Sequence, residues 1–153
     1  TLDRSKLELN SFLAEILNTL QTAPVAVGKP LNFVAMRSPI TVSVDRDKFK
    51  QVLINLVTNA CEAVDSGDAI TIHIRDEASR ICIQIHNGGT PIPADILPQL
   101  TQPFFTTKPS GTGLGLAIVK RIVEAHDGDL RIESGEGIGS IVTVQLPLVT
   151  QIQ

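Results

Sequence analysis

The sequence is short of several residue types, and each shortage excludes a class of protein. Its 153 residues include no tryptophan or tyrosine and only 3% aromatics, so a core must be built from leucine, isoleucine and valine. A net charge of −3 does not provide the basic surface of a nucleic-acid-binding protein. No apolar run is long enough to span a membrane, and no signal peptide opens the chain. We therefore expect a cytoplasmic segment without membrane or nucleic-acid contacts.

Only two cysteines are present, Cys61 and Cys82, and both lie inside apolar patterns. A disulfide or a metal site would need closer pairing or more ligands, so we expect buried free thiols of a reducing compartment. The chain begins at Thr1 without a methionine. This start indicates a segment of a longer parent protein and leaves open whether that parent is anchored in a membrane.

The apolar periodicity predicts an α+β fold. Helices are expected over 11–21, capped by Asn10 or Ser11, from a cap at Asp45 to about Val64, and from about Gly115 to His126. Strands are expected over 31–36, 40–44, 69–74, 80–86, 129–134 and 140–148. In the central pair the isoleucines share one face, and Thr71, His73, Gln84 and His86 share the other. The arrangement predicted is a two-layer sandwich, a mostly antiparallel mixed sheet with three helices on one face. Residues 1–150 would form one domain and 151–153 a tail.

The second predicted helix carries a polar stripe beside its apolar arc. Asn55, Asn59 and Glu62 fall within roughly 60° of one another at 100° per residue. Two asparagines at positions i and i+4 point the same way and can approach one object. Asparagine is a mediocre helix former, so the pair costs some stability unless it is used. Taken alone, however, the stripe is most simply a solvated face.

A glycine-rich passage, "PFFTTKPSGTGLGLAIVK" at 103–120, precedes the third helix. Gly111, Gly113 and Gly115 let the backbone approach a ligand closely. The helix start offers unpaired N–H groups and a positive dipole end, which favour phosphate. Lys108 adds a positive charge nearby, and "NGGTPIP" at 87–93 adds a polar turn after a strand. Each feature alone is an ordinary flexible loop or turn.

The order of these features is what makes them specific. The sequence resembles the catalytic, ATP-binding domain of sensor histidine kinases, in the GHKL group with the Bergerat ATP-binding fold. "NLVTNACEA" resembles the N box, "NGGTPIP" the first glycine box, "PFFTTK" the F box and "GTGLGL" the second glycine box. The resemblance covers about residues 9–147, and its residue pattern is closest to the nitrogen-regulator-like kinases.

The resemblance implies a site for ATP and Mg²⁺. Asn59 would coordinate Mg²⁺ between the phosphates with help from Asn55, and a lid from Pro93 to Ser110 would carry Lys108 to the phosphates. Catalytic roles fall on Asn55, Asn59 and Lys108, and the metal ligand is Asn59. The residues expected to contact the nucleotide are Asn55, Asn59, Glu62, Asn87, Gly89, Ile92, Phe105, Thr106, Thr107, Lys108, Gly111, Thr112, Gly113, Leu114, Gly115 and Leu116.

Three positions depart from the family pattern. Many relatives have a basic residue where this chain has Glu62. The first glycine box usually begins with an aspartate that binds the adenine amino group, and here that residue is Asn87; Pro91 replaces a usual glycine. A neutral hydrogen bond is weaker than a charged one, so we expect adenine binding to be about tenfold weaker.

The resemblance also implies the reaction. GHKL hydrolases place a glutamate at the Asn55 position to activate water, so Asn55 indicates a site that holds ATP for another acceptor. That acceptor would be a histidine on a separate dimerisation domain of the same parent protein, with a response regulator downstream. None of His73, His86 and His126 has such a context; the first two are expected on a strand face and His126 at an ordinary helix end. Two alternatives are an anti-sigma-factor-type serine kinase and a degenerate nucleotide-binding regulatory module.

Overall fold

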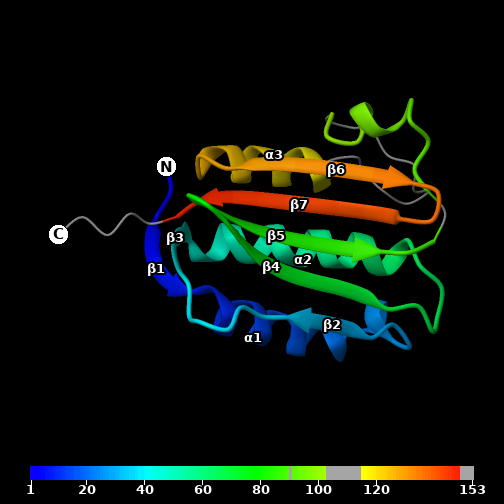
Figure 1. Cartoon of the computed structure of the whole chain (residues 1–153), viewed down its shortest axis with the longest axis horizontal. Helices are drawn as coiled ribbons and strands as arrows, with labels where there is room; N and C mark the ends of the chain where they lie inside the picture. The colour runs from blue at the N-terminus through cyan, green and yellow to red at the C-terminus, as the bar shows by residue number, and fades with distance from the viewer. Residues whose placement is uncertain (90, 103–114, 149–153) are drawn as a thin grey trace.

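A computed structural model of the chain describes residues 1–89, 91–102 and 115–148. Figure 1 shows the arrangement of its helices and strands. No helix within these ranges is long and apolar enough to cross a membrane. In chain order the elements are β1 (Arg4–Glu8), α1 (Leu9–Gln21), the 3₁₀ helix η1 (Pro24–Ala26), β2 (Leu31–Val34), β3 (Thr41–Asp45), α2 (Arg46–Glu62), β4 (Ile70–Glu77), β5 (Arg80–Asn87), the 3₁₀ helix η2 (Leu97–Gln99), α3 (Gly115–Ala125), β6 (Asp129–Gly135) and β7 (Gly139–Pro147).

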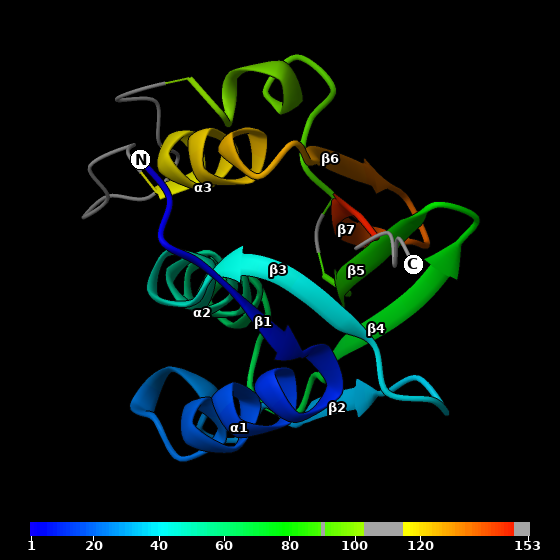
Figure 2. The same ribbon diagram turned by 90° about the vertical axis from the view of Figure 1, so that its left-hand side faces the viewer.

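Five strands form the main sheet in the order β2-β4-β5-β7-β6. β2 is parallel to β4, and the other neighbours are antiparallel. The helices α1, α2 and α3 lie on one face of this sheet (Figure 2). The predicted α+β sandwich with a mixed, mostly antiparallel sheet is therefore confirmed. A second sheet pairs β1 with β3; β1 was not predicted, since its five residues carry no clear alternation and depend on a partner about 40 positions away.

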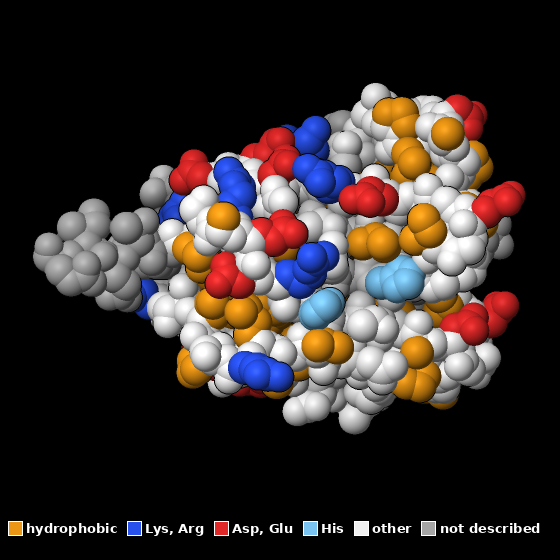
Figure 3. All heavy atoms as spheres, viewed as in Figure 1, with side chains coloured by type: hydrophobic (Ala, Val, Ile, Leu, Met, Phe, Trp, Pro, Cys, Tyr) orange, Lys and Arg blue, Asp and Glu red, His pale blue; other side chains and the backbone are white. Residues whose placement is uncertain are grey.

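The core lies between the sheet and the helices. The isoleucines of β4 and β5 are buried there, as are Phe49, Leu53 and Leu56 of α2. On the outer face of the sheet, His73 is half-buried and His86 exposed, as predicted. Figure 3 shows histidine side chains on this face among side chains of both charges, without a continuous basic patch.

Both cysteines are buried and unpaired with each other, as predicted. The Cys82 thiol donates a hydrogen bond to Oε1 of Glu77 at 3.0 Å. Burial is the main cause that raises the pKa of each thiol, because an apolar environment disfavours the charged thiolate. Cys61 is therefore a small side chain of the core, whereas Cys82 is buried on the opposite face of the sheet from the core isoleucines of β5.

The caps of the first two helices are carboxylates. Asp45 caps α2 as predicted, with Oδ1 accepting from Lys48 N at 3.2 Å, and its Oδ2 accepts from Asp3 N at 3.0 Å. The Asp3 amide, followed by the Lys48 amide, lowers the pKa of Asp45, because both bonds favour the ionised form. The cap predicted for α1 is wrong. Glu8 accepts there from the amides of Asn10 and Ser11 at 2.8 and 3.0 Å.

The α1 cap differs from the prediction because of a long-range contact. The side chain of Asn10 is occupied by the backbone of Met36: Nδ2 donates to its carbonyl at 2.9 Å, and Oδ1 accepts from its amide at 3.1 Å. Sequence rules favour short polar caps and do not anticipate a glutamate that folds back from the end of a strand.

His126 has a larger structural role than a helix-end residue. It is 1% exposed. Its Nε2 accepts from Asp45 N at 2.9 Å, and its Nδ1 lies 2.8 Å from the Ile122 carbonyl. A carbonyl can only accept, so the imidazole is neutral with its proton on Nδ1. Arg4 lies 3.4 Å from the Asp127 carboxylate. These contacts hold the C-terminal end of α3 against β1 and the start of α2.

Candidate functional site

The ends of three elements meet at one side of the domain. α2 ends and α3 begins toward the same side, where β5 also ends (Figure 1), and α2 packs beside α3 (Figure 2). Gly89 follows β5 with a φ of +94°, and a Cβ there would lie 3.1 Å from the carbonyl oxygen of Ala63. A side chain at position 89 would therefore be strained and would press on the end of α2. This brings the first glycine box against the end of the N-box helix.

The polar stripe of α2 lies outside the core, as its helical spacing predicts. Asn55 and Asn59 are half-buried and Glu62 is exposed, while Leu56, Val57 and Ala60 between them are buried. Because the two amide groups are half-buried, their movement is restricted, but they can still be reached by solvent or a ligand. Amide oxygens are among the ligands that Mg²⁺ accepts in proteins. The two asparagines therefore fit a metal-assisted phosphate site in their chemistry.

Asn87 is the last residue of β5 and is only 5% exposed. Its Nδ2 donates to the carbonyl of Gly88 at 2.7 Å. This bond uses the nitrogen end of the amide, so Oδ1 is the atom that can accept from an adenine amino group. The geometry is compatible with the base-binding role that the sequence assigns to this residue.

The hairpin of β6 and β7 supports this strand end, a contact that sequence reasoning did not identify. Asn87 pairs with Ser140 of β7. Gly139 has a φ of +79°, and a Cβ there would lie only 2.1 Å from the backbone oxygen of Asn87. In addition, Ile92 N donates to Oγ of Ser134 at 2.7 Å. The glycine-rich turn "GEGIGS" was a visible signal, but nothing local in it points to a partner 50 residues earlier.

Several predicted contacts lie outside the described residues. These are Phe105, Thr106, Thr107, Lys108, Gly111, Thr112, Gly113 and Leu114, and their roles stay predictions. Of the remaining glycine-box residues, Gly115 is the exposed first residue of α3, and Leu116 packs against the core. At the base of the predicted lid, η2 packs on β6.

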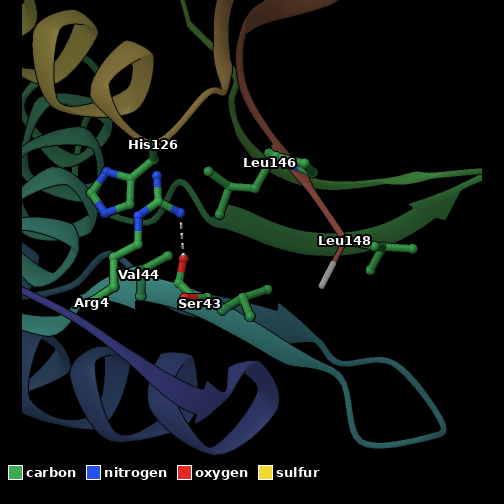
Figure 4. Close-up of a pocket in the computed structure, with 8 residues that line it drawn as sticks. Arg4, Ser43, Val44, His126, Leu146 and Leu148 are labelled. Carbon is green, nitrogen blue, oxygen red and sulfur yellow. Dashed lines mark hydrogen bonds between the residues drawn. The ribbon is translucent and has the colours of Figure 1, made fainter. Parts of the chain in front are cut away.

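A cavity of about 190 Å³ lies at the other side of the domain, away from these residues. Arg4, Ser43 and His126 line it together with aliphatic side chains (Figure 4). The guanidinium of Arg4 donates to the carbonyl of Ser43 at 3.3 Å. Within the described ranges, no group of three or more His, Cys, Asp or Glu residues could hold a metal ion. The cavity is thus separate from the predicted nucleotide and metal site.

Comparison with known proteins decides the family. The pattern described as "Histidine kinase-, DNA gyrase B-, and HSP90-like ATPase" matches residues 44–150. The chain belongs to this family. The solved catalytic domain of histidine kinase ThkA superimposes with a TM-score of 0.87 at 32% identity, covering 96% of this chain and 97% of that one. The resemblance to the catalytic, ATP-binding domain of sensor histidine kinases is thereby confirmed, and the narrower nitrogen-regulator-like assignment stays a prediction.

Curated relatives carry the same kind of domain in longer chains. Sporulation kinase C of Bacillus subtilis strain 168 is 43% identical over 143 residues, which is 92% of this chain and 33% of the relative. The signal transduction histidine-protein kinase AtoS of Escherichia coli K12 is 36% identical over 147 residues, 95% of this chain and 24% of AtoS. The histidine kinase domain described above thus spans a third or less of these relatives.

Proposed function

We propose that this chain binds Mg-ATP and donates the γ-phosphate to a histidine on a separate dimerisation domain of the same parent protein. The observation that carries the proposal is the meeting of the α2 end, the Asn87–Gly89 turn and the start of α3 at one side of a histidine kinase-type domain. Residues 1–150 would form this catalytic unit, and 151–153, outside the described residues, a tail.

Each described element has a proposed task at this site. Asn59 would give its amide oxygen to Mg²⁺, and Asn55 would help to orient the same phosphates. Bound Mg²⁺ would neutralise the negative charge of the phosphates. The N-terminus of α3 at Gly115 would face the phosphates, and Lys108, outside the described residues, would contact them from the lid. Phosphoryl transfer depends mainly on such positioning and charge neutralisation.

The first position of the N box separates transfer from hydrolysis. Activation of water requires a general base of suitable pKa. The amide of Asn55 cannot act as one, so ATP bound here would be held for an incoming imidazole. AtoS is named a histidine-protein kinase and ThkA a histidine kinase. This agreement supports the proposal over a serine kinase or a degenerate regulatory module.

We further propose a cytoplasmic location and a response regulator as the downstream partner. ThkA has been solved in complex with the response regulator protein TrrA, and that ThkA chain matches this one with a TM-score of 0.82 at 29% identity. The match covers 95% of this chain and 42% of that one. It supports a response regulator as the acceptor that follows the histidine.

The proposal is tested by transfer of labelled γ-phosphate to the dimerisation domain of the parent protein, supplied separately. We expect labelled acceptor only in the presence of this chain, ATP and Mg²⁺. The chain alone should bind nucleotide without becoming stably labelled, since none of its three histidines has the context of a phosphoacceptor. Label retained on the chain itself, or free phosphate released without an acceptor, would contradict the proposed reaction.

Replacement of Asn87 by aspartate should strengthen ATP binding about tenfold, because a charged acceptor makes a stronger hydrogen bond with the adenine amino group. The carboxylate cannot donate to Gly88 as the amide does, so we expect some loss of thermal stability alongside the tighter binding. Calorimetric titration and a melting curve measure the two effects. Asn32→Asp, on the outer strand β2, is a control for the added charge. If the wild-type chain does not bind ATP and the Asn87→Asp variant does, the proposed contact between Asn87 and the base is wrong.

A further inference from the structure

The hydroxyl of Ser134, the next-to-last residue of β6, lies where three polar groups meet. Ile92 N donates to its Oγ at 2.7 Å. The hydroxyl donates to the carbonyl of Gly139 at 2.9 Å. The hydroxyl of Ser140 lies 3.2 Å away. A single side-chain atom thus links the first glycine box to both strands of the β6–β7 hairpin.

The three contacts have only one consistent pattern of donors. A serine hydroxyl has one proton and two acceptor positions. The carbonyl of Gly139 can only accept, so it receives the proton of Ser134. The amide of Ile92 can only donate, and the hydroxyl of Ser140 must then donate as well. Every hydrogen-bonding position of Ser134 is in use, which fixes the hydroxyl in one orientation.

The bond from Ile92 has no substitute nearby in the backbone. Ile92 lies between Pro91 and Pro93, and proline has no N–H. Ile92 therefore supplies the sole backbone donor of this tripeptide, and Ser134 is its acceptor. The same hairpin also holds the start of the segment, because Asn87 pairs with Ser140 and its backbone oxygen lies against Gly139. Asn87 and Ile92, the described residues that begin and nearly end this glycine box, are thus attached to β7 and β6 respectively.

We propose that Ser134 is a positioning residue for the nucleotide base. By holding Ile92 in place, it would keep Oδ1 of Asn87, in the same glycine box, directed toward an adenine amino group, without Ser134 itself touching nucleotide or metal. This inference rests on the proposed function, since it assumes that the base binds beside Asn87. Its effect falls on recognition of the base and not on the phosphates.

The test compares the wild-type chain with Ser134→Ala, Ser134→Thr and Ser43→Ala. Ser43 is a matched control, since it is also a strand serine but lines the cavity at the opposite side. In Ser134→Ala we expect the amide of Ile92 to exchange with solvent at least about tenfold faster. Affinities for ATP and ADP should each fall by the same factor, about three- to tenfold. In the transfer assay KM for ATP should rise while kcat changes less than about twofold. Ser134→Thr, which keeps a hydroxyl, should recover most of both losses, and Ser43→Ala should match the wild type.

Two results would overturn the assignment. Unchanged exchange of the Ile92 amide in Ser134→Ala would show that the hydroxyl does not hold the segment. Faster exchange with unchanged ATP affinity would show that the segment is held but does not serve the base. If the wild-type chain does not bind ATP, both the proposed function and the base-positioning role of Ser134 are wrong. The exchange of the Ile92 amide does not depend on ATP binding, so it tests by itself whether Ser134 anchors Ile92.

Discussion

Replacing Asn59 with alanine should lower the rate of Mg-ATP-dependent labelling of the dimerisation domain by at least about a hundredfold, which in practice abolishes it. The change removes the amide oxygen proposed to bind Mg²⁺, and phosphoryl transfer depends on neutralising the phosphate charge. Asn59 lies in the last turns of α2 and is half-buried outside the core. Alanine is the better helix former, so α2 should remain intact and the loss should be specific to the reaction.

The control for this variant is Gln51→Ala. Gln51 is an exposed amide of the same helix, eight residues earlier, and therefore on a similar helical face but about 12 Å from Asn59 along the axis. We expect it to retain full transfer activity. Titration with ATP in the presence and absence of Mg²⁺ completes the comparison, since only Asn59→Ala should lose the Mg²⁺-dependent part of binding. Full transfer activity in Asn59→Ala would refute the metal assignment.

Gly139→Ala should produce the largest loss of stability among single changes near the site. The residue has a φ of +79°, and the added Cβ would lie 2.1 Å from the oxygen of Asn87 and 2.7 Å from Cα of Gly88. Both neighbours are backbone atoms and cannot turn aside as the end of a flexible side chain can. We expect the free energy of unfolding to fall by roughly 3 to 5 kcal/mol, the sum of backbone strain and overpacking. Chemical denaturation of the isolated chain measures this loss.

Gly137→Ala separates the two causes. Gly137 is in the same turn with a φ of +76°, but its added Cβ would meet nothing within 4 Å. It should lose only the strain of the left-handed backbone, roughly 1 to 2 kcal/mol. If the two variants lose equal stability, the contact with Asn87 is not what requires glycine at position 139. If Gly139→Ala does fold, ATP affinity should fall more than in Gly137→Ala, because the end of β5 must move.

The parts of the fold that follow local rules were predicted well. The alternation of isoleucines correctly placed β4 and β5, the cap at Asp45 correctly placed the start of α2, and the helix end expected near His126 agrees with the observed end of α3 at Ala125. These features depend on neighbours two to four positions apart, which a sequence displays directly. The missed features, β1 and the Glu8 cap, depend on contacts with residues far along the chain.

The order and spacing of the four boxes were sufficient, from the sequence by itself, to determine the family and to single out Asn55, Asn59 and Asn87. Their chemistry needs particular residue types at fixed spacing, and that requirement is visible without coordinates. Only the tertiary structure decided that Gly139 and Ser134 support the first glycine box, and that His126 joins the far end of α3 to the start of α2. Each of these contacts joins segments more than 40 residues apart, and their close approach is a property of the folded chain that no local pattern records.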